Sequence, residues 1–162
     1  FEAILHARDR LQEQQLVEQL EQQFEARMEA ERRRIRELRA DELRVEQTVR
    51  HIQDKILTLK CPRCEAAFVD FNGCFALTCH RCQCGFCAYC LADCGGDAHA
   101  HVAQCPHRLR EGYFAAQEDF EEAQRRRRQR MLQEYIATVG ADIRERVIAA
   151  CAQDVADLGL QL

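Results

Sequence analysis

Residue types that mark several common protein classes are scarce in this chain of 162 residues. It has no tryptophan, two prolines and seven glycines, which excludes collagen and a Pro/Gly-rich linker. No apolar run reaches the ~18 residues of a membrane span, and the first residues do not resemble a signal peptide, so we expect a soluble, cytoplasmic protein. The 23 basic and 27 acidic side chains give a net charge of −4, which argues against a general nucleic-acid-binding surface.

Cysteine, in contrast, is abundant and clustered. Ten of the 11 cysteines lie between Cys61 and Cys105. Their odd number and their C-x-x-C pairs favour a reduced, metal-loaded module over a disulfide scaffold. A segment of about 45 residues with few large apolar side chains cannot bury a large core, so we expect bound zinc to stabilise it.

The first 60 residues contain neither glycine nor proline and are rich in strong helix formers. Alternating steps of four and three residues place ten apolar side chains and three glutamates along one face, namely Val17, Glu21, Phe24, Met28, Glu31, Ile35, Leu38, Glu42, Val45, Val49, Ile52, Ile56 and Leu59. This pattern predicts a coiled-coil-like helix over residues 1–60. The glutamates weaken its seam, so packing on another helix of this chain competes with self-association or a partner helix.

The cysteine-rich segment, residues 61–107, is expected to be a small domain with two zinc sites. It holds four of the seven glycines, which indicate tight turns. Residues 65–71 and 75–78 are predicted as two short strands on either side of an Asn72-Gly73 turn.

Residues 108–162 are predicted to form two further helices, over 108–139 and 141–158, separated at Gly140. Cys151 falls on the apolar face of the second and is interpreted as a buried small side chain. The four arginines that follow Glu121 and Glu122 are interpreted as a solvated or internally paired helix face. The expected fold is therefore a small zinc-stabilised domain between long α-helices of a coiled-coil-like frame.

Two C-x-x-C pairs separated by 14 residues have the spacing of a zinc ribbon. Their four thiolates, from Cys61, Cys64, Cys79 and Cys82, would complete a tetrahedral Zn²⁺ site and leave no open position for catalysis. The first site is therefore predicted to be structural.

A second set of ligands follows at once. Cys87 and Cys90 form another C-x-x-C pair, and His101 and Cys105 stand four residues apart, within reach from one helical turn. His99 is the alternative histidine ligand. Together the two sets predict two Zn²⁺ ions per chain.

Three cysteines of the module have no place in these two sites. Cys84 could replace Cys82 as a ligand, and Cys94 could replace His101. Cys74 differs from both because it lies inside the 14-residue loop without a C-x-x-C partner. Its presence there needs a separate explanation.

The cysteine order CPRCEAAFVDFNGCFALTCHRCQCGFCAYC resembles the second RING-like (Rcat) domain of the RING-between-RING ubiquitin ligases. That family has an opening C-x-x-C pair, then a Gly-Cys element followed by four residues and a cysteine, then further pairs and a closing His/Cys pair. The matching residues here are Cys61, Cys64, Gly73, Cys74, Cys79, Cys82, Cys87, Cys90, His101 and Cys105. The resemblance covers about 45 residues.

The resemblance implies that Cys74 accepts ubiquitin as a thioester from a ubiquitin-conjugating enzyme and passes it to an amine. Many members of the family place a histidine two residues after this cysteine, where this chain has Ala76. The general base is therefore expected to be His80, or whichever of His99 and His101 does not bind zinc. The alternative is a non-catalytic zinc-binding protein-interaction module in which Cys74 is a small buried side chain.

Overall fold

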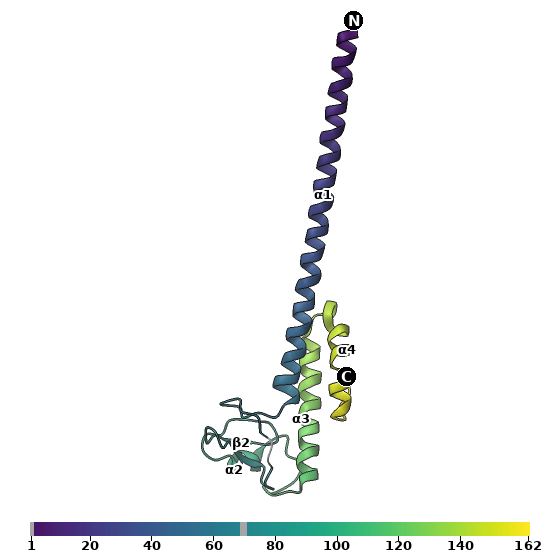
Figure 1. Ribbon diagram of the computed structural model, residues 1–162. Helices are drawn as coiled ribbons and strands as arrows, with labels where there is room; N and C mark the ends of the chain where they lie inside the picture. The colour runs from purple at the N-terminus through teal and green to yellow at the C-terminus, as the bar shows by residue number, and fades with distance from the viewer. Residues whose placement is uncertain (1, 69–70) are drawn as a thin grey trace. The chain divides into compact units, whose positions relative to one another are not determined.

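The computed structural model describes residues 2–68 and 71–162, and the side chains of this range from residue 10 onward. Two compact units are present, Phe1–Arg44 and Val45–Leu162, so the segments 61–107 and 108–162 share one unit. The elements follow one another in Figure 1 as α1 Glu2–His51, the π-helical η1 Ile52–Leu57, β1 Ala76–Thr78, β2 Gly85–Cys87, α2 His99–Gln104, α3 Gln117–Thr138 and α4 Ala141–Asp157.

The first unit is the greater part of α1. Its helix is uninterrupted because the sequence offers no glycine or proline and consists mostly of strong helix formers. Surface ion pairs run along it, such as Arg36 with Glu29 at 2.8 Å. Nearly every side chain between residues 10 and 44 is exposed, and that includes the apolar residues of the predicted seam.

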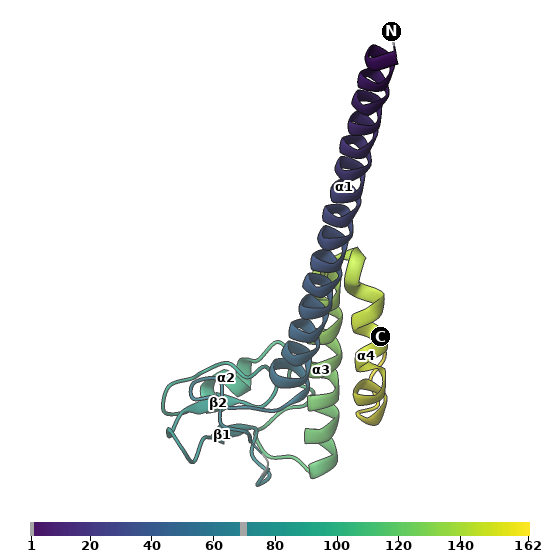
Figure 2. The ribbon, with the colours of Figure 1, turned by 45° about the horizontal axis from the view of Figure 1, so that its top comes forward.

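In the second unit, the end of α1 and η1 pack against α3 and α4, which lie side by side (Figure 2). The apolar seam is buried within this chain here, as the intramolecular alternative predicted. Val45 and Val49 are partly buried against the core. The buried members of this core are Ile52, Ile56, Leu57, Leu132, Val139, Ile143, Val147, Cys151, Val155 and Leu160.

The end of this helix, expected near residue 60, lies at Leu57 and is held by arginines of α3. Arg127 donates to the carbonyl of Ile56 at 3.3 Å, and Arg128 donates to the carbonyl of Leu57 at 2.8 Å. The last carbonyls of a helix lack partners within it and carry partial negative charge, so guanidinium groups suit them well. Burial of the Arg127 side chain lowers its pKa to about 10. The other two arginines of the run, Arg125 and Arg126, pair with Glu122, as an internally paired face predicts.

The small sheet differs from the predicted hairpin. β1 pairs antiparallel with β2, with Leu77 opposite Phe86, whereas residues 65–71 supply only an isolated bridge at Ala67 among their described members. Residues 69 and 70 lie outside the described residues. The reversal between the strands is made by residues 79–84, where the Cys79 amide donates to the Cys84 carbonyl at 2.9 Å. A cysteine-containing turn, not Asn72-Gly73, therefore closes the hairpin.

The α3 helix begins at Gln117 and not at Arg108, because residues 113–115 are used elsewhere. The amide of Phe75 donates to the carbonyl of Tyr113, and that of Ala115 donates to the carbonyl of Gly73. This pairing extends the chain around Cys74 and leaves the segment before α3 irregular.

Side chains of α3 also attach it to the cysteine-rich module. Gln124 is buried and donates to the carbonyl of Ala88 at 2.7 Å. Phe120 stacks on Phe71 with ring centroids 4.3 Å apart. Successive turns of α3 thus contact first the cysteine-rich module and then the end of the first helix.

The last helix agrees with the sequence expectation. α4 spans Ala141–Asp157 after a break at Gly140, and Cys151 is buried on its inner face. Across the described residues, no helix is both long enough and apolar enough to span a membrane.

Candidate metal centres and reactive cysteine

The four cysteines of the first predicted site come together in space. The sulfur atoms of Cys61, Cys64, Cys79 and Cys82 all lie within 4.8 Å of one another. The Cys61–Cys82 and Cys64–Cys79 separations are each 3.6 Å. Four sulfurs at ~2.3 Å from a central metal would be about 3.8 Å apart, so this cluster has the size and shape of a tetrahedral metal site.

All three C-x-x-C pairs adopt the same local turn. The residue directly after each pair, Glu65, Gln83 or Leu91, has a positive φ of 57–60°, and these are the only non-glycine residues with positive φ in the described chain. Each donates its amide to the carbonyl of the first cysteine of its pair, at 2.8–3.0 Å. A side chain in this left-handed region costs about 1–2 kcal/mol, so three repeats of it indicate that the turns serve a common purpose.

In each cluster, one cysteine thiol has a lowered pKa and another has a raised one. A backbone hydrogen bond from Cys82 lowers the pKa of Cys79 to about 6. In the second cluster, a hydrogen bond from the Cys87 side chain lowers the pKa of Cys90 to about 4. The same contact raises the pKa of Cys87, and burial raises that of Cys82. Because metals bind the thiolate and not the thiol, Cys79 and Cys90 are the cysteines of the two clusters that reach the ligand form most readily.

The second cluster combines the Cys87 pair with the end of α2. The ligand atoms of Cys87, Cys90, His101 and Cys105 lie within 4.8 Å of one another, with His101 Nε2 3.2 Å from Cys90 Sγ. His101, the histidine favoured by spacing, stands on α2, and Cys105 directly follows this helix, one turn away. The described residues thus hold two Cys/His clusters that could each bind a metal ion.

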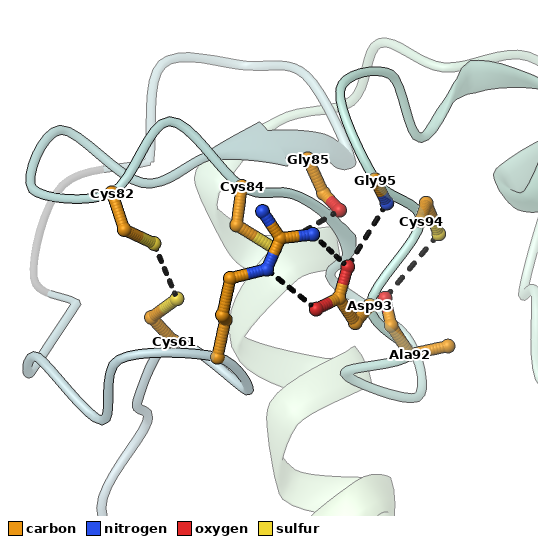
Figure 3. Close-up of polar contacts among 9 residues, drawn as sticks. Cys61, Cys82, Cys84, Gly85, Ala92, Asp93, Cys94 and Gly95 are labelled. Atoms are coloured by element: carbon orange, nitrogen blue, oxygen red, sulfur yellow. Dashed lines mark hydrogen bonds and ion pairs between the residues drawn. The ribbon is translucent and has the colours of Figure 1, made fainter.

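An ion pair that the sequence did not indicate joins the two clusters. Arg63, inside the first C-x-x-C turn, donates two hydrogen bonds to Asp93, at 2.9 and 2.7 Å. Asp93 follows the second cluster's turn and also accepts from the amide of Gly95 at 2.9 Å (Figure 3). The Arg63 guanidinium holds the pKa of Asp93 well below its usual range. This bidentate contact fixes one turn relative to the other.

Cys84 and Cys94 belong to neither cluster. The Cys84 thiol is buried and contacts the carbonyl of Gly85 at 3.5 Å, and the Cys94 thiol contacts that of Ala92 at 3.3 Å (Figure 3). Burial raises the pKa of Cys84 to about 11, which favours its neutral thiol. Both cysteines therefore serve as small side chains between the turns.

Cys74 lies outside both clusters and is partly exposed. Gly73, with φ at +91°, turns the chain before it, and Phe75 after it is completely buried against Tyr89, with ring centroids 4.1 Å apart. Backbone pairing with residues 113–115 holds this position from the other side. The thiol therefore projects from a rigid backbone without being packed into the core.

The side chain beside this thiol is His99. Its Nε2 lies 3.6 Å from Cys74 Sγ, and its Nδ1 lies 2.5 Å from Asp97 Oδ1. Asp97 also accepts the His99 backbone amide at 3.1 Å, and the ring of Tyr113 contacts the histidine edge-on. Hydrogen bonding to His99 lowers the pKa of Asp97, so the carboxylate is held ionised. Asp97, His99 and Cys74 thus form a chain of contacts from a carboxylate through an imidazole to a thiol.

His80, the other predicted base, is exposed in the turn between Cys79 and Cys82, where its carbonyl accepts from Gln83. A catalytic role for His80 stays a prediction. Asp97 was missed altogether, although its position two residues before a histidine was visible in the sequence. Comparison of the chain with known protein families, curated proteins and solved structures found no match.

Proposed function

We propose that both clusters hold Zn²⁺ and that Cys74 is the nucleophile of a ubiquitin transferase resembling the Rcat domain of RING-between-RING ligases. The observation that carries this proposal is the chain of contacts from Asp97 through His99 to Cys74. Asp97 Oδ1 lies 2.5 Å from His99 Nδ1, and His99 Nε2 lies 3.6 Å from Cys74 Sγ. A nucleophile within reach of a base that is itself oriented by a third group is the usual arrangement of covalent catalysis.

Zinc suits the two clusters because four thiolates, or three thiolates and an imidazole, form the closed tetrahedral sets that structural zinc prefers. When bound, the metal supplies stability and no open coordination position. The chain's own residues then carry the chemistry. Cys74 lies in the segment between the two C-x-x-C pairs of the first cluster, while its sulfur stays outside both clusters.

The contacts of His99 favour one tautomer of its neutral ring. Because Nδ1 faces the Asp97 carboxylate, that nitrogen carries the proton, and Nε2 presents its lone pair to the Cys74 thiol. Nε2 can therefore accept the thiol proton as the sulfur becomes nucleophilic. Asp97 stabilises the imidazolium that results.

The reaction follows from the acyl donor that the resemblance implies. The Cys74 thiolate attacks the thioester carbonyl of ubiquitin on the conjugating enzyme, and the enzyme's cysteine leaves as a thiolate that takes up the proton held by His99. In the second step an amine attacks the new Cys74 thioester and loses a proton to the neutral His99. The Cys74 thiolate leaves and regains that proton from His99. Both steps exchange one acyl bond for another and need no oxidant or reductant.

The test combines an adduct assay with a reactivity assay. With charged conjugating enzyme or a ubiquitin carrying a C-terminal electrophile, the wild type should form an adduct on Cys74. Cys74→Ala should form none, and with charged conjugating enzyme Cys74→Ser should trap a thiol-resistant oxyester. Alkylation of Cys74 in the isolated chain, located by mass spectrometry, should slow by about 10²-fold or more in His99→Gln.

Two controls make this result specific. His80→Gln removes the other candidate base and should leave the alkylation rate within about twofold of wild type. The metal content of Cys74→Ala should remain that of the wild type, since Cys74 is no ligand. If His80→Gln slows the reaction as much as His99→Gln, the assignment of the base is wrong. An adduct that persists in Cys74→Ala would favour the non-catalytic interaction module.

A further inference from the structure

The part of α1 that belongs to the first unit exposes an apolar seam to solvent. The seam residues Val17, Phe24, Met28, Ile35 and Leu38 are 42–63% exposed. An isolated helix gains little stability from its own sequence, and a helix with an apolar stripe normally buries it against another element. The same four-three spacing continues through Val45 to Ile56, where the seam is packed against α3 and α4. Residues 17–42 thus carry the same apolar spacing along α1 with side chains that stay exposed.

The charges on one flank of this seam occur in two blocks. In the heptad that the seam defines, the positions directly after Val17, Phe24, Glu31 and Leu38 carry Glu18, Glu25, Arg32 and Arg39. The order is two acids and then two bases. Such an arrangement is complementary to itself only when it is read in opposite directions.

We propose that residues 17–42 pair with the same residues of a second copy of this chain as an antiparallel coiled coil. In the register that aligns the two blocks, Phe24 packs opposite Ile35 of the second copy, and Glu21 opposite its Leu38. Met28 then stands opposite Glu31, and Val17 opposite Glu42, so the seam glutamates face apolar residues and not each other. Each carboxylate can reach the edge of the interface, and Glu31 already contacts Arg34 at 4.0 Å.

The flanking charges support this register. Glu18 faces Arg39 of the second copy, and Glu25 faces its Arg32, so the two-fold symmetry produces four attractive pairs. The opposite flank is less favourable, because Arg27 faces Arg34 there in two symmetric contacts. The balance still favours antiparallel association.

In a parallel dimer of the same helix, like charges would face each other beside the seam. Heptad geometry would set Arg27 against Arg32, Arg34 against Arg39, and Asp41 against Glu46 of the second copy. Each contact joins like charges and occurs twice. Charge complementarity therefore selects both the partner, a second copy, and its direction.

The test measures the dimer dissociation constant of the whole chain by sedimentation equilibrium. Variant A, Glu18→Arg with Glu25→Arg, makes all four flank positions basic. Variant B, Arg32→Glu with Arg39→Glu, makes them all acidic. Each variant alone should raise the dissociation constant on the order of 50-fold. An equimolar mixture of A and B should form a mixed dimer, because all four pairs are again attractive.

Variant B also discriminates direction. In a parallel dimer it would replace two repulsive contacts, Arg27–Arg32 and Arg34–Arg39, with attractive ones and tighten association. The matched control, Arg33→Glu with Arg36→Glu, changes the net charge equally on the outer face of the helix. It should leave the dissociation constant within about threefold of wild type.

Three results would overturn the proposal: a wild-type chain that stays monomeric at roughly 0.5 mM, tighter association of variant B, or a mixture of A and B that does not associate. Metal content should be unchanged in all variants. This readout separates a lost interface from a lost fold of the Val45–Leu162 unit. The outcome is independent of Cys74 chemistry, which the adduct assay measures.

Discussion

Gly85 occupies a position in β2 where no other residue fits. A Cβ added there would stand 2.9 Å from the amide nitrogen of Asp97 and 2.9 Å from the carbonyl carbon of Gly96. Both are backbone atoms, which cannot rotate out of the way as a side chain can. Hydrogen bonds of 2.8 Å with Gly95 and Cys94 hold the two segments together at this point. The substitution Gly85→Ala must therefore push the segment that carries Asp97 away from β2.

Overpacking of this kind costs about 1–3 kcal/mol of unfolding free energy. For a unit the size of Val45–Leu162, each kcal/mol lowers the melting temperature by about 4 °C, so Gly85→Ala should melt roughly 4–12 °C below the wild type. The displacement also moves Asp97 away from His99. Alkylation of Cys74 should therefore slow in the folded variant at a temperature well below its transition.

Gly96→Ala is the matched control. Gly96 has no positive φ, and an added Cβ meets nothing within 4 Å, so the same methyl group should be tolerated there. Thermal unfolding followed by circular dichroism compares the two variants directly. Equal melting temperatures for Gly85→Ala and Gly96→Ala would refute the steric argument.

Two further predictions concern the metal sites and the helical frame. Cys61→Ser should release one metal equivalent and unfold the cysteine-rich module, because structural zinc contributes on the order of 10 kcal/mol against a typical total stability of ~5–15 kcal/mol. Cys84→Ser should keep both metals, and equal loss in the two variants by metal analysis would show that the ligand set is wrong. Hydrogen bonds from Arg125 and then Arg126 lower the pKa of Glu122 from 4.5 to about 2, so Glu122 stabilises the fold above pH 4.5 and loses this effect as the pH falls toward 2. The difference in melting temperature between wild type and Glu122→Gln should therefore be constant near neutral pH and shrink below pH 4.5; a difference that does not vary with pH would contradict this assignment.

The parts of the chain that the sequence predicted well depend on interactions between near neighbours. The long helix follows from a run of helix formers without glycine or proline, and α4 follows from Gly140 and the apolar spacing after it. The ligand clusters were predictable because each C-x-x-C turn positions two sulfurs within four residues. Pairing of the turns then leaves few alternatives.

The predictions that were wrong concern segments whose structure depends on contacts with distant parts of the chain. The predicted hairpin at Asn72-Gly73 is wrong because residues 73–75 pair with 113–115, some 40 residues later. The same pairing delays the start of α3 to Gln117. No local pattern in either segment indicates its partner.

The roles of His99 and His101 show where sequence reasoning ended and tertiary structure decided. Spacing alone allowed either histidine as a ligand, since both lie near Cys105. In a helix, residues two apart point about 200° away from each other, so α2 can turn only one of them toward the second cluster. His101 faces that cluster, and His99 faces Cys74 and Asp97. The sequence by itself determined the helices, the cysteine pairs and the unusual position of Cys74, because these depend on local spacing. Which histidine meets Cys74, which strand pairs with β1 and how Arg63 meets Asp93 were decided by the folded chain, because only folding brings those residues together.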